Sequence, residues 1–335
     1  MKRTALKTLI CLTSLLAASA AAQMQAVPAY KPAQQISGTI RIWGSPQLSD
    51  LLHLYEAGFR KQHPAVQFVE DLKSTLTAVA GVYTDRADIG LLGREIWPTE
   101  EQAFTSIKGH TPLLIDIATG SYDVPKATFA LMICVPQANP ISSLSTTQLA
   151  NLFSNTSDHP IHTWGDFGLK GSWAQRPIHL YGFTVENDKS QVFSQLVFPP
   201  GERWNAMLHE FSNGAGLNGA DAGELIVRAV AADPDGIGIS NVHYSSPATK
   251  FLALSTPNHP APIPAIRENV ASRLYPLTRA IYMVVNAGPG QPLAPTLREF
   301  LRFVLSSQGQ AAVQKEGNYL PLPPALAVHQ YESLQ

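Results

Sequence analysis

A serine that follows a strand and opens a helix is the first feature of this chain with potential chemistry. Residues 39–43 alternate as a β-strand does, and Gly44 ends the run. Ser45 and Pro46 then form a strong helix start, because serine caps the first turn and proline gives up no needed donor. Ser74 is expected to cap a later short helix in the same way. Such helix starts gather free amide groups and can bind an anion, but they also fit ordinary capped helices.

Asp88 and Arg94 are the charged candidates that follow. Asp88 lies in the apolar run 87–92, where a carboxylate is costly unless it is paired. It therefore either accepts the proton of a protonated oxyanion or pairs with Arg94 or Arg86. The guanidinium fork of Arg94 suits a tetrahedral oxyanion, and the alternative is a surface ion pair with Glu95.

A second group of candidates lies in the middle of the chain. Lys189 and Ser190 open a helix after the strand expected at 178–182, where they either contact an anion or lie on a solvated face. Glu186 and Asp188 come just before them and would repel a dianion.

Motifs typical of enzymes and metal sites are missing from the sequence. It has no G-x-S-x-G, no zinc-binding helix and no P-loop, so we expect no catalysis and no cofactor. His159 and His162 have H-x-x-H spacing, but no carboxylate or cysteine cluster lies nearby, so we expect no metal. Cys134 lies in an apolar strand and is expected to be a core residue.

The N-terminus predicts export. Residues 1–22 have the basic start, short apolar run and small-residue end of a cleaved secretory signal peptide, and residues 23–36 are expected to be a linker. Cleavage removes Cys11, so Cys134 has no intrachain disulfide partner. The net charge of -1, with charged residues only 15% of the chain, argues against binding to nucleic acid. We expect a periplasmic protein that is a monomer.

The order of the elements predicts an α/β fold. Strand and helix patterns alternate as βαβαβα up to residue 107, which favours a largely parallel sheet with helices on both faces. The last strong helical pattern, at 297–307, has an apolar stripe that we expect to pack on the lobe containing residues 39–43.

Several short motifs, in their order and spacing, resemble one family. They are Gly44-Ser45, Ala87-Asp88-Ile89-Gly90, Arg94-Glu95-Ile96, the pattern from Ser145 to Phe153 with Trp164, Asp235-Gly236-Ile237-Gly238-Ile239, Tyr275-Pro276-Leu277-x-Arg279 and the run 299–310. Together they resemble the type II periplasmic binding proteins, and most of all the phosphate-binding proteins of ABC transporters.

The resemblance implies an α/β protein of two lobes, each a mostly parallel sheet flanked by helices. It places lobe one at 37–117 and 245–325, lobe two at 118–244, and the two hinge crossovers near 118–121 and 240–244. The ligand would be enclosed in the cleft between the lobes.

The resemblance also implies site residues. Ser45, Ser74 and Asp88 match the lobe-one part of the family's phosphate site. The family's lobe-two arginine and Ser-Gly-Thr turn are missing, because this chain reads Phe183-Thr184-Val185-Glu186-Asn187-Asp188-Lys189-Ser190 at that place. We therefore expect phosphate binding much weaker than micromolar unless Arg94 or Lys189 turns into the cleft.

The resulting hypothesis is an exported solute-binding protein that holds a small, phosphate-like oxyanion and catalyses nothing. Its partner would be the membrane component of an ABC transporter. The alternative is a transporter-independent sensor or interaction module with a different ligand, and a phosphatase on the same scaffold is a third hypothesis.

Overall fold

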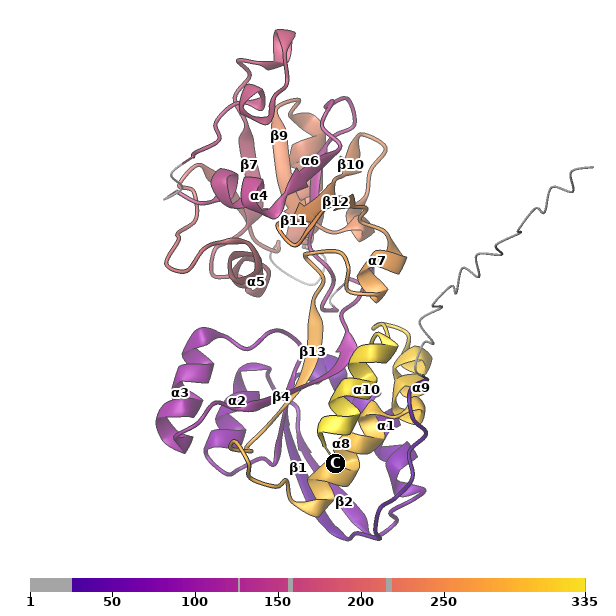
Figure 1. The fold of residues 1–335 in the computed structure, drawn as a ribbon. Helices are drawn as coiled ribbons and strands as arrows, with labels where there is room; N and C mark the ends of the chain where they lie inside the picture. Colours follow the sequence, from indigo (N-terminus) through magenta and orange to yellow (C-terminus); the bar gives the residue numbers. More distant parts are fainter. Residues whose placement is uncertain (1–25, 126, 156–158, 215–218, 335) are drawn as a thin grey trace, which may run out of the picture.

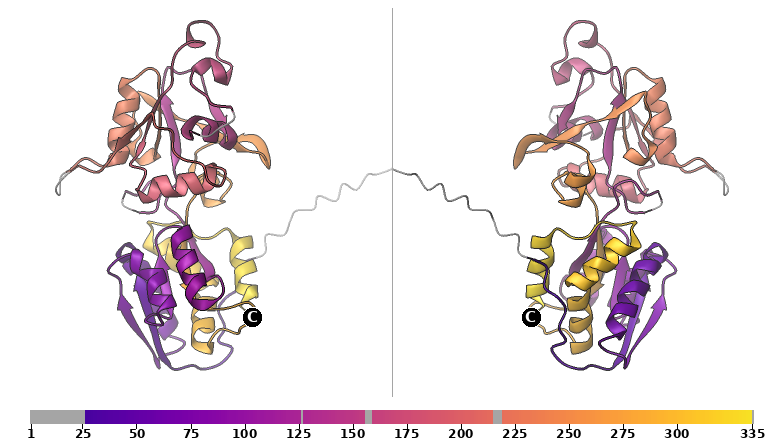
Figure 2. Two further views of the ribbon diagram at one scale, coloured as in Figure 1. Left: turned by 90° about the vertical axis from the view of Figure 1, so that its left-hand side faces the viewer. Right: turned by 90° about the vertical axis from the view of Figure 1, so that its right-hand side faces the viewer.

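The computed structural model shows two α/β lobes joined by two connecting segments (Figure 1). It describes residues 26–125, 127–155, 159–214 and 219–334, so the expected signal peptide lies outside the described residues. The lobes are stacked end to end, and the two further views show the same separation (Figure 2). Within the described ranges, no helix is both long and apolar enough to span a bilayer.

Lobe one combines the N-terminal strands with the C-terminal helices. Its sheet has the order β2-β1-β3-β13-β4. The strands are β1 (Gly38–Gly44), β2 (Val66–Asp71), β3 (Ile89–Leu92), β4 (Leu113–Thr119) and β13 (Ala280–Val285). One face carries α1 (Ser49–Arg60), α8 (Pro295–Leu305), α9 (Ser307–Glu316) and α10 (Pro324–Ser333), and α2 (Leu76–Tyr83) and α3 (Pro98–Lys108) lie on the other.

Lobe two has a second five-stranded sheet, in the order β10-β5-β9-β7-β8. Its strands are β5 (Met132–Pro136), β7 (His179–Phe183), β8 (Leu208–Phe211), β9 (Gly236–Ser240) and β10 (Thr249–Phe251). A smaller sheet joins β6 (Ser143–Ser145), β11 (Ala253–Thr256) and β12 (His259–Ile263). The helices are α4 (Thr146–Phe153), α5 (Asp188–Val197), α6 (Ala222–Ala232) and α7 (Arg267–Ala271).

One strand in each five-stranded sheet runs against the others. In lobe one it is β13, which pairs antiparallel with both β3 and β4. In lobe two it is β5, which pairs antiparallel with β9 and β10. Each of these strands is the first that the chain adds to a five-stranded sheet after crossing from the other lobe. The expected mostly parallel sheets are therefore found, with the exceptions at the crossovers.

The second crossover differs from the expected position. The sequence predicts a return to lobe one at 240–244, but β10 pairs with β5 and β11 pairs with β6, which keeps these strands in lobe two. The chain returns only after α7, through residues 272–279. Lobe one also extends beyond residue 325, because α10 packs on α8 and β4.

The segment expected to be a linker packs on lobe one over its described part. Tyr30 is buried, and its hydroxyl donates to Glu299 Oε2 (2.7 Å) and lies 2.6 Å from His63 Nε2. Ser307 N donates to the carbonyl of Pro28. The described part of the expected linker is thus attached to α8 and α9. The prediction that the helix at 297–307 packs on the lobe of β1 is confirmed by α8.

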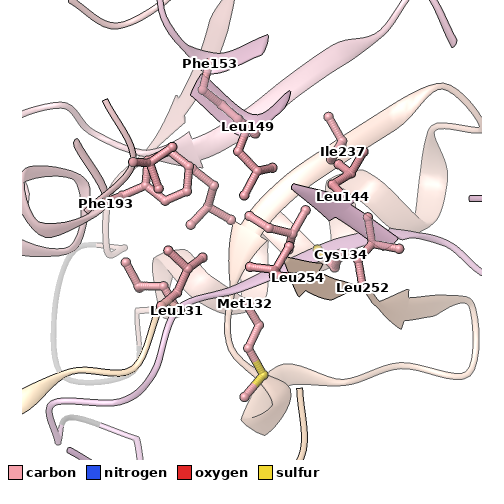
Figure 3. Close-up of a cluster of buried hydrophobic side chains, with 14 of the residues drawn as sticks. Leu131, Met132, Cys134, Leu144, Leu149, Phe153, Phe193, Ile237, Leu252 and Leu254 are labelled. Carbon is pink, nitrogen blue, oxygen red and sulfur yellow. The ribbon is translucent and has the colours of Figure 1, made fainter. Parts of the chain in front are cut away.

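Buried apolar clusters hold the lobes together: one lies mainly in lobe two, and lobe one has one on each face of its sheet. Figure 3 shows part of the lobe-two core, where Cys134 lies among leucine, isoleucine and phenylalanine side chains. Cys134 is fully buried, and this burial raises the pKa of its thiol to about 12. It is therefore a core residue, as the sequence predicted.

Gly120 marks the place where the two crossovers touch. Its amide donates to the carbonyl of Arg279 (2.8 Å), and the neighbouring Ser121 amide donates to the carbonyl of Thr128 (2.7 Å). A Cβ on Gly120 would lie 2.4 Å from the Thr128 carbonyl oxygen and 3.0 Å from that of Arg279. Only glycine allows this backbone approach.

Gly120→Ala is expected to lower the free energy of unfolding by about 3 kcal/mol, because the added methyl meets backbone that cannot move without separating the crossovers. Gly182→Ala is the matched control, since its Cβ would first meet the movable side chain of Leu208 at 3.1 Å, and it should cost about 1 kcal/mol or less. Urea unfolding of both variants measures the difference, and equal costs would contradict this account of the hinge.

Candidate functional site

A cleft of about 370 Å³ lies where the two lobes face each other. Its lobe-one wall comes from the loops after β1 and β3 and from the start of α2, and its lobe-two wall comes from the start of α5. The lining residues are Ser45, Gln47, Thr75, Leu76, Gly93, Arg94, Trp97, Ala127, Thr128, Asp188 and Lys189. Hydroxyl groups, two cations and one carboxylate therefore share the cleft with an apolar patch.

Ser45 occupies the carboxyl end of β1, as the sequence predicted, but it does not cap a helix. Its amide donates to the Leu91 carbonyl (3.0 Å), and its hydroxyl donates to Gln47 Oε1 (2.8 Å). The chain continues into a short 3-10 turn, Pro46–Leu48, before α1 begins. Across the cleft floor, the Thr128 hydroxyl donates to the Gly93 carbonyl and so joins the first crossover to the end of β3.

Arg94 lines the cleft and is already paired. Its guanidinium binds both carboxylate oxygens of Glu100 (2.8 and 2.7 Å) and donates to the Glu95 carbonyl (2.8 Å). The same group lies 3.8 Å from the ring centre of Trp97. The indole nitrogen of Trp97 is buried without a hydrogen-bond partner. Arg94 is thus held rigidly at the wall, with Glu100 rather than the expected Glu95 side chain as its ion-pair partner.

Asp188 and Lys189 form the lobe-two wall. Lys189 Nζ lies 3.4 Å from Asp188 Oδ1, and the Lys189 amide donates to Asn187 Oδ1 (3.0 Å) at the helix cap. Asp188 Oδ2 accepts a bond from Arg279 Nη1 (3.2 Å). The carboxylate that the sequence treated as a repulsive group therefore has two cations beside it.

Arg279 connects this wall to lobe one from behind the cleft. Its side chain is 1% exposed and lies in the second crossover, directly before β13. Nε and Nη2 donate to Glu95 Oε2 (3.1 and 2.9 Å), while Nη1 reaches Asp188. One guanidinium thus bridges a lobe-one carboxylate and a lobe-two carboxylate.

The charged groups around Asp188 and Arg279 determine the protonation state of both side chains. Burial acts to raise the pKa of Asp188, but Lys189 and Arg279 outweigh it and hold the pKa below its usual value. Burial also opposes the charge of Arg279, yet Glu95 and Asp188 raise its pKa above the usual range. Asp188 is therefore a carboxylate at neutral pH, and the groups beside it nearly cancel its charge.

Asp88, which the sequence proposed as a ligand residue, lies away from the cleft. It sits just before β3, at the strand end opposite Gly93, and its carboxylate pairs with Arg41 (Oδ1 to Nη2 2.6 Å, Oδ2 to Nε 3.1 Å). The Arg41 amide also donates to Asp88 Oδ2 (2.8 Å). Neither Arg94 nor Arg86 is its partner, because the register of β1 against β3 brings Arg41 alongside it.

The structure places the other predicted residues at the margins of the cleft. Ser74 accepts a bond from the Leu76 amide (3.2 Å) and precedes the lining residue Thr75. Ser190 is buried and donates to the Phe183 carbonyl (3.1 Å), so it supports the α5 start without lining the cleft. Glu186 is exposed and belongs to a different surface hollow.

Sequence reasoning missed four contributors. Thr128, Trp97 and Glu100 belong to no recognisable motif. Arg279 belonged to the motif Tyr275-Pro276-Leu277-x-Arg279, but its role depends on contacts distant in sequence. The described residues include His159 and His162 but not residues 156–158. Among them, no three potential metal-ligating side chains lie close enough together to hold a metal ion.

Residues 29–308 match the family model described as the PBP superfamily domain. The chain belongs to the PBP superfamily. The phosphate-binding protein PstS of Pseudomonas aeruginosa is 31% identical over 317 residues, which cover 93% of this chain and 92% of that protein. Protein SphX of Synechococcus elongatus is 24% identical over 205 residues, covering 60% of this chain and 56% of its own length.

Solved structures agree with this assignment at the level of the fold. PstS from Borrelia burgdorferi matches with a TM-score of 0.57 at 15% identity, covering 85% of this chain and 99% of that one. An ABC-type phosphate transport receptor from Vibrio cholerae matches with a TM-score of 0.53 at 16% identity, covering 84% and 99%. Membership of the PBP superfamily confirms the two-lobed fold and a substrate-binding rather than an enzymatic role.

The partner of Asp88 is open to a direct test. A double-mutant cycle with Arg41→Gln and Asp88→Asn should give a coupling energy of about 1 kcal/mol, because the pair is only partly shielded from water. The cycle of Asp88→Asn with Arg94→Gln should be additive within about 0.3 kcal/mol. Urea unfolding supplies the four stabilities of each cycle, and coupling to Arg94 would place Asp88 at the cleft after all.

Proposed function

We propose that this chain is an exported substrate-binding protein that holds a phosphate-like oxyanion in the interlobe cleft and delivers it to an ABC transporter. The observation that carries the proposal is the 31% identity to the phosphate-binding protein of Pseudomonas aeruginosa over almost the whole chain. The cleft supports it, because its donors are hydroxyl groups and cations arranged on both walls.

The balance of charge in the cleft favours binding through hydrogen bonds rather than through net charge. Arg94 is neutralised by Glu100, and the cations Lys189 and Arg279 are matched by Asp188 and Glu95. When the lobes close, the hydroxyl groups of Ser45 and Thr128 orient the anion by exchanging their present acceptors, Gln47 Oε1 and the Gly93 carbonyl, for the ligand.

Asp188 supplies selectivity in this proposal. A carboxylate that stays ionised can accept the hydrogen of a protonated phosphate, whereas sulfate at neutral pH has no hydrogen to give. Facing sulfate, the carboxylate would lose its partner and repel the ligand. The role that the sequence gave to Asp88 thus passes to Asp188.

A larger, organic oxyanion is a second candidate ligand. Leu76 is 59% exposed, and it lines the cleft together with Trp97. These side chains offer an apolar wall that inorganic phosphate does not need. A phosphate monoester that binds tighter than phosphate would favour this candidate.

Calorimetry on protein freed of bound anion tests the proposal. Phosphate should bind at least about tenfold more tightly than sulfate, and Asp188→Asn should remove most of that preference, because a carboxylate oxygen that faces an anion without a hydrogen between them costs about 1–3 kcal/mol. Glu186→Gln is the matched control on the exposed loop and should keep the preference.

Parent protein that binds neither phosphate nor a phosphate monoester would contradict the proposed function. Equal affinities for phosphate and sulfate in the parent would remove Asp188 from the recognition of the ligand.

A further inference from the structure

We propose that Arg279 is the positioning residue that aims the Asp188 carboxylate into the cleft and couples it to lobe one. This inference rests on the proposed function and names the residue on which its selectivity depends. Arg279 does not line the cleft itself, so it acts through Asp188.

Burial and hydrogen bonds hold the Arg279 side chain in one position. It is 1% exposed, and each of its three nitrogens donates to a carboxylate. Glu95, which takes two of these bonds, is also in reach of the Ala280 amide (3.3 Å) at the start of β13. The guanidinium is therefore fixed to the end of β3 and the start of β13, and Nη1 has a set position behind the cleft.

Because of that position, the two carboxylate oxygens of Asp188 have different partners. Oδ2 accepts from Arg279 at 3.2 Å, while the contact of Oδ1 within the described part of the chain is the longer one to Lys189, at 3.4 Å. The Asp188 side chain is 36% exposed and lines the cleft, so Oδ1 is the oxygen available to accept a ligand hydrogen. Without Arg279 the carboxylate would have no anchor from behind.

The charged groups around Asp188 give Arg279 a measurable electrostatic role. Arg279 and Lys189 are the cations next to Asp188, Glu95 stands behind Arg279, and Glu186 lies on the same loop. Across the cleft, Arg94 is balanced by Glu100. Removing Arg279 leaves Glu95 and Asp188 as like charges with nothing between them, which favours protonation of Asp188.

The arrangement also joins the lobes. Glu95 follows β3 in lobe one, Asp188 opens α5 in lobe two, and Arg279 lies in the return crossover. A shift of the lobe-one wall is therefore transmitted to the lobe-two carboxylate through one rigid group, without a contact across the open cleft.

The experiment compares Arg279→Gln with Arg279→Lys and with the double variant Arg279→Gln/Glu95→Gln. Arg279→Gln alone leaves the Glu95 carboxylate without its cation and can therefore prevent folding. The double variant removes both charges and avoids this. Arg273→Gln is the matched control: Arg273 is also in the return crossover, but its hydrogen bonds go to Asp116 (2.7 Å), Thr119 and the Ala118 carbonyl, which do not line the cleft. Phosphate and sulfate affinities are measured by calorimetry between about pH 4.5 and pH 8, in steps of roughly half a pH unit.

Binding through Asp188 requires its carboxylate form, so a higher pKa of Asp188 moves the acid loss of phosphate binding to higher pH. We expect this shift to be largest in Arg279→Gln, smaller in the double variant because Glu95 no longer repels, and least in Arg279→Lys. The preference for phosphate over sulfate should fall about tenfold in Arg279→Gln. Arg273→Gln should lower the unfolding free energy and leave both measures unchanged.

A second readout needs no ligand. The carboxyl carbon of Asp188, followed by NMR through a pH titration, should titrate at higher pH in Arg279→Gln and in the double variant than in the parent. An unchanged Asp188 titration would overturn the inference whether or not the parent binds phosphate. Failure of the parent to bind any oxyanion, with the Asp188 titration shifted as expected, would instead overturn the proposed function alone.

Discussion

The structure depends on one buried guanidinium that is shared by two lobes. Removing charged groups from water costs several kcal/mol for each ion unless the partners are close and well oriented. Arg279 meets that requirement with Glu95 on one side and Asp188 on the other. The end of β3, the start of α5 and the start of β13 must therefore meet at one place, and the cleft lies directly in front of it.

The crossovers make this meeting possible. Gly120 lets the backbones of the two connecting segments touch, and the Thr128 hydroxyl joins the first of them to Gly93 of lobe one. Arg273, in the second segment, donates hydrogen bonds to the end of β4, at Asp116, Thr119 and the Ala118 carbonyl. The lobes are hence joined by short, hydrogen-bonded backbone rather than by a loose linker, which suits a hinge with a limited range of motion.

Local sequence patterns predicted those features that depend on interactions between residues close together in the sequence. The strand before Ser45, the helix α8 and the α/β class follow from periodicity and capping residues, and Ser45, Arg94 and Lys189 do lie at the cleft. The return crossover could not be placed this way, because β10 and β11 owe their lobe to pairing with strands over a hundred residues earlier. Asp88 shows the same limit: its place in an apolar run indicated a partner, but only the register of two strands identifies Arg41.

The most direct measurement is a crystal structure with arsenate, a phosphate analogue whose anomalous scattering locates it without ambiguity. The account predicts arsenic between the two walls of the cleft, with its oxygens near Ser45 and Thr128 on one side and near Asp188 and Lys189 on the other. Arsenic bound elsewhere, such as at the hollow beside Arg298 on the far end of lobe one, with the interlobe cleft empty, would contradict it.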